Sequence, residues 1–366
     1  MRRGRRLALI VATAIIVAGC NATPPPSGSP TATPTTTASA PSGQPATLSP
    51  SSEPGGATAR WESLTPGSPA PAPRSGHTWV GDPSSGVAYL FGGQGQSEPL
   101  DDLWTYDLAA DRWRPTARTG ETPPARSGHV AAWIDGIGAV IFGGRLDAAV
   151  ANDLWAYDPD AGAWRTVDTT GPTPPARTDA CAAMRPDGRW WISHGTGVDG
   201  NPLGDTWALD PGASTWSAIT VGGTSAPPLS GSDCWWLDAE RLVLVGGRGA
   251  DGRPNGDVWV LTAGSDTSSW ERLPATTPPR GFAAATETTE GLAVFGGRGA
   301  DDALLGDLYV QDRKTLEAIP YQPADAAPSA RSDGAFIDDP ASERILFFGG
   351  TDAAGPSGGL WSLRLS

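Results

Sequence analysis

Five arginines recur along this chain at intervals of roughly one or two times 50 residues: Arg74, Arg126, Arg177, Arg280 and Arg331. A guanidinium group presents a planar fork of donors that suits a carboxylate, a phosphate or a sugar acid. Other polar side chains that could join such a site stand in the same segments: His77, His129, Asp179, His194, Asp233 and Asp333. These residue types predict a polar ligand site if the fold brings them together.

The spacing of the arginines follows a repeat that a glycine doublet marks six times. Its second glycine recurs in steps of 51, 51, 52, 50 and 53 residues, at Gly93, Gly144, Gly195, Gly247, Gly297 and Gly350. A period near 50 predicts a repeat architecture with one supersecondary unit per period. The six units are numbered below in chain order, by their doublets.

Each unit contains the signals of four short strands. An arginine opens the first strand, except in the fourth unit, where Ser230 takes its place. An apolar run before the doublet and an Asp-Leu-Trp segment after it predict the second and third strands. A later tryptophan predicts the fourth strand, with Leu316 in its place in the fifth unit. Four-stranded units repeated radially predict an all-β, six-bladed β-propeller.

The pattern resembles the kelch repeat over residues 60–366. The resemblance rests on the Arg-Ser-Gly-His entry, the apolar-Gly-Gly element, the later tryptophan and turns such as Asn152-Asp153-Leu154-Trp155. His194 departs from the pattern, because it stands in the first glycine position of unit three. The sixth unit lacks a tryptophan strand, and an unassigned strand at Trp61 precedes unit one, so we expect this strand to complete the sixth blade and close the ring.

The first 59 residues predict export and membrane anchoring. Residues 1–19 have a charged start and a short apolar run, which is typical of a signal peptide. The run ends in Val-Ala-Gly-Cys20, which resembles a bacterial lipobox and implies lipidation of Cys20; a plain secretory signal is the alternative. Residues 20–59 are rich in Pro, Thr, Ser and Ala and predict a disordered tether. We therefore expect an extracytoplasmic protein that meets the membrane only through its N-terminal lipid.

Composition narrows the partners. The formal net charge of −14 argues against nucleic acid as a partner. We expect the protein to be a monomer. Beyond Cys20 the chain has two cysteines, Cys181 and Cys234, which align at one position of neighbouring units. An oxidising compartment favours a disulfide between them, and two buried thiols are the alternative.

The order of strands places the candidate residues on one face. The start of each first strand and the end of each second strand share one side of the disc, so the loops before the arginines and after the glycines converge on one channel mouth. In kelch propellers this face often binds partners, and the resemblance implies that arginines of the first strand take part. The alternative is that the arginines pair with neighbouring aspartates and hold loop carbonyls.

Catalytic readings have less support. Three histidines are the main argument for a metal site, because histidine is a common metal ligand. No acidic ligand stands at a diagnostic spacing from them, so we predict no metal and no cofactor. Copper radical oxidases share the kelch fold, but their ligand pattern is missing. A sugar-acid enzyme resembling the sialic acid mutarotases is the alternative function, because six blades with an arginine-lined mouth would suit it. We predict a binding protein that recognises a protein or a glycan and catalyses nothing.

Overall fold

The structure is a computed structural model that describes residues 56–117, 120–274 and 278–366. The predicted signal peptide, Cys20 and the predicted tether as far as residue 55 lie outside the described residues. Within the described ranges, no helix has the length and apolar character needed to cross a bilayer.

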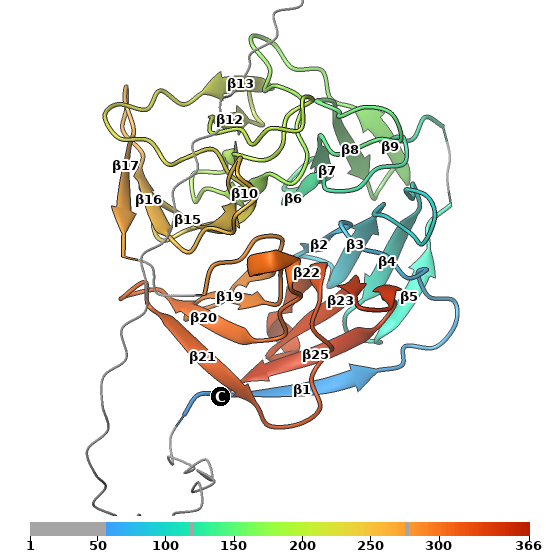
Figure 1. Cartoon of the computed structure of the whole chain (residues 1–366). Coiled ribbons are helices and arrows are strands. Elements are labelled where there is room, and N and C mark those ends of the chain that lie inside the picture. The colour runs from blue at the N-terminus through green and yellow to red at the C-terminus, as the bar shows by residue number, and fades with distance from the viewer. Residues whose placement is uncertain (1–55, 118–119, 275–277) are drawn as a thin grey trace, which may run out of the picture. The chain divides into compact units, whose positions relative to one another are not determined.

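The described chain folds into short β-strands and two single-turn 3-10 helices, η1 (Ala300–Asp302) and η2 (Pro340–Ser342). Four of the sheets hold four antiparallel strands each, in which every strand pairs with the next along the chain. Figure 1 shows the sheets arranged around a central axis, which confirms an all-β propeller with four-stranded antiparallel blades.

These four sheets correspond to units one to four. Their strands are β2 (Thr78–Asp82), β3 (Val87–Phe91), β4 (Leu103–Asp107), β5 (Arg112–Pro115), β6 (Val130–Ile134), β7 (Gly138–Phe142), β8 (Leu154–Asp158), β9 (Ala163–Thr166), β10 (Cys181–Met184), β11 (Trp190–Ser193), β12 (Thr206–Asp210), β13 (Thr215–Ala218), β14 (Ser230–Trp236), β15 (Arg241–Arg248), β16 (Val258–Thr262) and β17 (Ser269–Leu273).

The remaining strands form one nine-stranded sheet. Two antiparallel runs within it are joined only where β21 and β1 pair in parallel, at Thr58 with Gln322 and Ala59 with Pro323. The first run is β18 (Ala284–Glu287), β19 (Gly291–Phe295), β20 (Leu308–Asp312) and β21 (Ala318–Pro323). The second run is β22 (Ser332–Asp339), β23 (Arg344–Asp352), β25 (Leu360–Leu365) and β1 (Thr58–Leu64), and β24 (Gly355–Pro356) pairs with β23.

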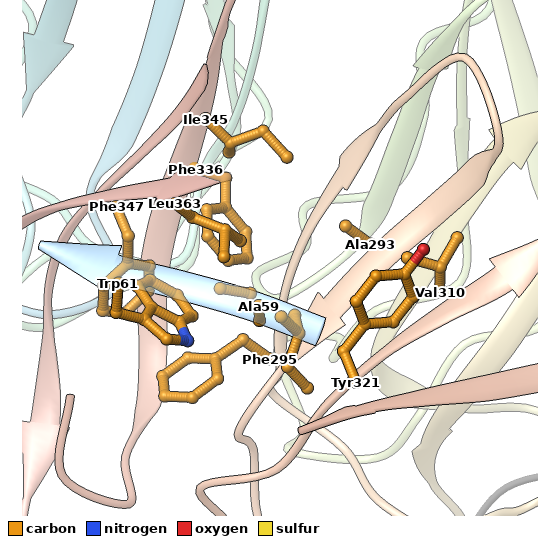
Figure 2. Close-up of a cluster of buried hydrophobic side chains, with 12 residues drawn as sticks. Ala59, Trp61, Ala293, Phe295, Val310, Tyr321, Phe336, Ile345, Phe347 and Leu363 are labelled. Atoms are coloured by element: carbon orange, nitrogen blue, oxygen red, sulfur yellow. The ribbon is translucent and has the colours of Figure 1, made fainter. Parts of the chain in front are cut away.

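The predicted strand exchange is present in this sheet. β1 runs antiparallel to β25 over six residue pairs, from Ala59 with Leu365 to Leu64 with Leu360. Trp61 is buried and packs against Phe295, with ring centroids 5.1 Å apart, and against Phe347 at 6.2 Å (Figure 2). Because Phe295 lies in β19 and Phe347 in β23, one side chain of β1 joins both antiparallel runs through apolar contact.

The fifth unit differs from the prediction at its second tryptophan position. Strand pairing places Ala318 opposite Gln311, as Trp113 lies opposite Tyr106 in unit one. Leu316 lies two residues earlier, in the turn, with φ of 57°. The prediction was wrong because sequence spacing alone does not show how many residues the turn takes up.

Candidate functional site at the channel mouth

The five arginines lie before the inner strands of their units, and each is 0–5% exposed. Arg126 is representative. Its Nη1 and Nη2 donate to Asp153 Oδ1 and Oδ2 at 2.7 and 2.9 Å, Nη1 also donates to Gly143 O at 2.9 Å, and Nε donates to Pro124 O at 3.1 Å. Corresponding contacts surround Arg74, Arg177 and Arg280.

In units one to three the aspartate of the pair also accepts a hydrogen bond from the tryptophan two residues after it. Trp155 Nε1 donates to Asp153 Oδ2 at 2.7 Å, and Trp104 and Trp207 make the same bond to Asp102 and Asp205. Burial alone would raise the pKa of Asp153, but hydrogen bonds from Arg126 and Trp155 hold it below its ordinary value. The repeated arginine, aspartate and tryptophan therefore form a polar strut that links the doublet to the third strand.

Arg331 of the sixth unit has a looser set of partners. Its Nη1 donates to Gly349 O at 3.0 Å, and its Nε and Nη2 donate to Ser329 O and Ser329 Oγ. The Nη2 atom of Arg331 lies 3.6 Å from Asp352 Oδ2. Burial lowers the pKa of the Arg331 guanidinium. An anion site built from the five arginines would have to displace these internal acceptors, which agrees with the structural alternative for the arginines.

Unit four replaces the strut with other residues. Leu229, rather than Ser230, occupies the arginine position, because Gly195 N donates to Leu229 O as Gly144 N donates to Arg177 O. Asn255 Nδ2 donates to Gly246 O at 3.2 Å and so takes over the contact that an arginine makes elsewhere. The aspartate of this unit, Asp257, pairs instead with Arg272 at 2.6 Å. The sequence prediction was therefore out of register by one residue here.

Six backbone hydrogen bonds form a closed ring at the mouth. The backbone N–H of each of six residues donates to the carbonyl oxygen of the residue before it in the ring. The six N···O distances are 2.7–3.0 Å. All six have φ between 54° and 64°, which turns their N–H and C=O groups along the ring. The ring consists of Gly76, Gly128, Asp179, Gly231, Phe282 and Asp333.

The ring brings two of the predicted site residues together. Asp179 and Asp333 lie three places apart in the six-membered ring, so they lie across it from each other. Burial raises the pKa of Asp179 to about 7, the charge of Asp333 adds to this, and Arg145 opposes it. Burial also raises the pKa of Asp333, while Ser332 and Arg298 act in the opposite direction.

The residue that follows each doublet supplies the other mouth side chains, and the sequence prediction missed them. Arg248 and Arg298 both pair with Asp302, at 2.9 and 3.2 Å. Arg145 is exposed and makes no ion pair with the described residues. The position directly after Gly-Gly was the available signal, because the second strand reaches the mouth there.

The predicted histidines do not face the mouth. His77 and His129 are 5% exposed and pack edge-on against Phe348 and Phe91 of the preceding units. His129 Nε2 lies 2.8 Å from Thr78 Oγ1. Burial lowers the pKa of His77 to about 3 and that of His129 well below its ordinary value, so both rings are neutral near pH 7.

His194 is also buried. Its φ of 60° is that of the glycine it replaces, its Nδ1 lies 2.6 Å from Ser193 Oγ, and its ring meets Trp270 edge-on. Burial lowers its pKa to about 4. Because Trp270 belongs to unit four, His194 lies at the junction of units three and four. Two departures from the repeat, His194 in a glycine position and the missing arginine of unit four, therefore meet at this junction.

The same junction carries the disulfide. Cys181 and Cys234 are joined with Cα atoms 5.6 Å apart. Strand pairing shows that Asp233, not Cys234, corresponds to Cys181, because each lies opposite the residue before its doublet. The predicted alignment was wrong by one position. Successive residues of a strand point to opposite faces, so residues that face each other between neighbouring blades differ in register by an odd number, here one.

Asp233 lines a cavity of about 340 Å³ between the inner strands β10, β14 and β18. No hydrogen bond to its carboxyl group is seen among the described residues, and burial raises its pKa to about 7 against the charge of Arg280. Of the predicted site residues, Asp179 and Asp333 lie on the mouth ring, Asp233 lines this channel cavity, and the arginines and histidines are part of the framework. The described residues contain no group of three His, Cys, Asp or Glu that could hold a metal ion.

Comparison with known proteins gives both sequence and structural matches. The model of the KLHDC2/KLHL20/DRC7 Kelch-repeats domain matches residues 56–247. Adagio-like protein 3 of Oryza sativa subsp. japonica is 30% identical over 198 residues, which cover 51% of this chain and 31% of the relative. The Rab9 effector protein with kelch motifs of Rattus norvegicus is 28% identical over 208 residues, covering 53% of this chain and 54% of the relative.

The solved structure of YjhT has a TM-score of 0.63 and 16% sequence identity, and the match covers 81% of this chain and 98% of YjhT. At this identity the match supports the propeller fold alone. The matched segments amount to about a third of the length of Adagio-like proteins 3 and 2.

Proposed function

The chain belongs to the kelch-repeat family, and from that premise we propose that it is a binding protein that holds a partner protein at the channel mouth. The fold by itself names no partner. What supports this proposal is a contrast among the arginines, since the five repeated ones are buried and hold the blades, whereas Arg145, on the loop after its doublet, is exposed.

The observation that carries the proposal is the pair Arg145 and Val198. Arg145 has an exposed guanidinium beside Asp179 and no ion pair with the described residues. Val198, on the corresponding loop of the next unit, is 74% exposed. Arginine is enriched at protein interfaces, and the exposed side chain of Val198 adds apolar surface on the adjoining loop.

We propose that the nine-stranded sheet acts as two blades, so that the ring has six. Six mouth residues in one closed hydrogen-bond ring support this count, as does the short parallel contact between β21 and β1. We further propose that the protein is a monomer and that a lipid on Cys20 anchors it outside the cytoplasmic membrane. The pairing of Cys181 with Cys234 supports an oxidising compartment.

The experiment is capture from a cell-envelope extract with immobilised wild-type chain and two double variants. Arg145→Ala with Val198→Ser removes the mouth pair, and Arg165→Ala with Ile319→Ser makes the same chemical change on outer strands. Both should melt like the wild type, because all four side chains are exposed and surface changes usually cost less than about 0.5 kcal/mol. A protein retained by the wild type and the outer variant, and lost by the mouth variant, supports the proposal.

Two results would contradict it. One is equal retention by both double variants, and the other is a captured sugar acid in place of a protein, which a glycan array run in parallel detects. Arg126→Ala serves as a third sample. Gly143 O and the half-buried carboxylate of Asp153 would lose this donor, so the variant should melt at a lower temperature and show what a framework defect does to capture.

A further inference from the structure

The face opposite the channel mouth carries two adjoining cavities. This face consists of the turns that join the first strand of each unit to the second and the third to the fourth. The cavities have volumes of about 750 and 440 Å³, and Gly81 and Pro83 line both. We call them together the turn-face groove. It runs over turns of units three, two, one and six, which favours an extended ligand over a compact one.

The larger cavity combines an aromatic face with unpaired carboxylates. Trp133 stacks on Tyr89 with centroids 5.6 Å apart and planes at 17°, and its Nε1 donates to Asp135 Oδ1 at 3.2 Å. Neither Asp135 nor Asp210 makes an ion pair with the described residues, whereas Asp187 already holds Arg189 at 2.7 Å. Carboxylates beside a half-buried indole suit a lysine or arginine side chain.

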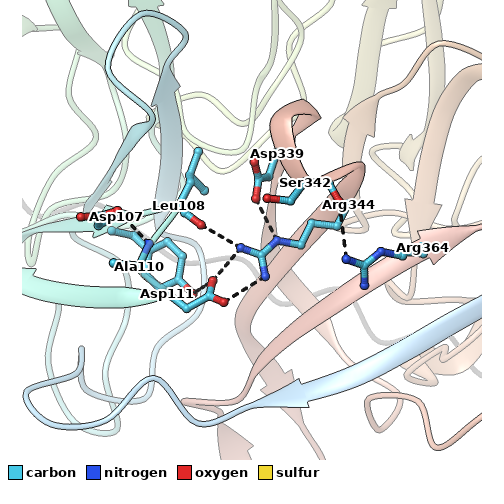
Figure 3. Close-up of polar contacts among 9 residues, drawn as sticks. Asp107, Leu108, Ala110, Asp111, Asp339, Ser342, Arg344 and Arg364 are labelled. Atoms are coloured by element: carbon cyan, nitrogen blue, oxygen red, sulfur yellow. Dashed lines mark hydrogen bonds and ion pairs between the residues drawn. The ribbon is translucent and has the colours of Figure 1, made fainter.

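The smaller cavity is mainly apolar, and hydrogen bonds hold its two sides in place. Leu108, Ile337 and Pro340 are among the residues that line it. Arg344 fixes its two sides relative to each other, since Nη2 donates to Leu108 O at 2.9 Å and to Asp111 Oδ1 at 2.6 Å, and Nε donates to Asp339 Oδ2 at 2.8 Å (Figure 3). The pocket can therefore hold an apolar side chain without rearranging.

The rim of the smaller cavity is acidic as well. Asp338 lines it and makes no ion pair with the described residues. Burial and the neighbouring carboxylate of Asp339 raise the pKa of Asp338, so a cation placed beside it would be favourable. The groove thus carries unpaired negative charge at both ends, in a chain whose formal net charge is −14.

From these contacts we propose that the turn-face groove binds an extended basic segment of a partner protein. A lysine or arginine of that segment pairs with the carboxylates of Asp135 and Asp210 beside the Trp133 ring, and an apolar side chain enters the pocket at Leu108 and Ile337. The site lies on the opposite face from the channel mouth, so it is independent of the proposed function. A propeller that uses both faces holds two partners at once.

The test uses the full chain and a fluorescein-labelled peptide of alternating arginine and leucine, with fluorescence anisotropy as the readout. Asp135→Asn with Asp210→Asn should weaken binding about fivefold or more, because two charge contacts are lost without a change of shape. Ala109→Trp, which fills the smaller cavity from its exposed edge, should weaken binding by a similar factor. The counterpart peptide with glutamate in place of arginine should not bind.

The matched control is Asp147→Asn with Asp168→Asn, which removes the same charge from exposed loops on the mouth side. It should bind the basic peptide within about twofold of the wild type, once salt near 0.1 M screens long-range attraction. Equal weakening in both double variants would assign the binding to net charge and overturn the proposal. Binding unaffected by Ala109→Trp would overturn it too, as would a concentration-dependent dimer that this substitution abolishes, because the occupant would then be a second copy.

Discussion

At the scale of single residues, the arginines show how one side chain type serves two purposes. The buried arginines of units one, two, three and five each bond to a carboxylate and two carbonyl groups, as Arg126 does, so their charge stabilises the blade. Arg145 is exposed and has no such partner, so its charge is available to a ligand. Breaking a buried ion pair costs far more than removing an exposed charge, which is why substitution at the two positions separates folding from binding.

Asp233 gives a residue-scale prediction about pH. Its pKa is about 7 in the folded chain against a reference of 3.8, so the folded state binds more protons between those values. The free energy of unfolding therefore falls as pH rises from about 4 to 7, and the loss is complete above 7. Asp233→Asn removes this penalty, and we expect a higher melting temperature than wild type at pH 8 and a vanishing difference near pH 4.

The measurement is a series of thermal melts at several pH values, with Asp147→Asn as the exposed control. Changes that both chains share, including those from the buried histidines, cancel in the comparison of Asp233→Asn with wild type. A difference in melting temperature that stays constant from pH 4 to pH 8 would show that Asp233 is not the titrating group.

At the scale of elements, the junction between units three and four departs most from the repeat. It lacks an arginine strut, holds His194 in a glycine position and carries the disulfide between β10 and β14. The disulfide therefore stabilises the junction where the regular polar contact is missing. The two cysteines are 53 residues apart in sequence. Closing a loop of that length removes much of the conformational entropy of the unfolded chain, which stabilises the folded one.

We predict that Cys181→Ala lowers the free energy of unfolding by about 4 kcal/mol. Cys234→Ala and the double variant should cost about the same, because each removes the one bond. Denaturant melts supply these values, and peptide mapping after alkylation of the native chain checks the bond itself. Alkylated peptides carrying Cys181 and Cys234 from unreduced protein would contradict it.

At the scale of the whole molecule, closure depends on β1. This strand pairs with β25 over six residues and places Trp61 between Phe295 and Phe347, so segments from opposite ends of the described chain share one core (Figure 2). Without β1, the edge of β25 would present unpaired backbone groups.

Trp61→Ala should therefore lower the free energy of unfolding of the whole propeller by about 3–5 kcal/mol, the usual cost of removing a buried tryptophan. Glu62→Ala on the exposed face of the same strand is the control and should change it by less than about 0.5 kcal/mol. Denaturant unfolding followed by circular dichroism measures both. Equal stability of the two variants would mean that β1 does not hold the ring.

The sequence by itself determined the strands, the four-stranded units and the exchange at Trp61, because a glycine doublet and alternating apolar residues are local patterns that repeat. It also indicated the cysteine pair and the face on which the loops meet. It did not reveal register, and so Leu316, Ser230 and the alignment of Cys234 were each misplaced by one or two residues.

Only the tertiary structure decided which charged residues are free. A buried arginine and an exposed one look alike in sequence, and the partner of Arg126, Asp153, lies 27 residues away, directly before β8. The ring that joins Asp179 to Asp333 consists of backbone bonds between different units, so no local pattern reports it. The turn-face groove likewise exists only because turns of four units meet around one axis. Local chemistry fixes what each segment becomes, and long-range packing fixes which of its groups remain available for binding.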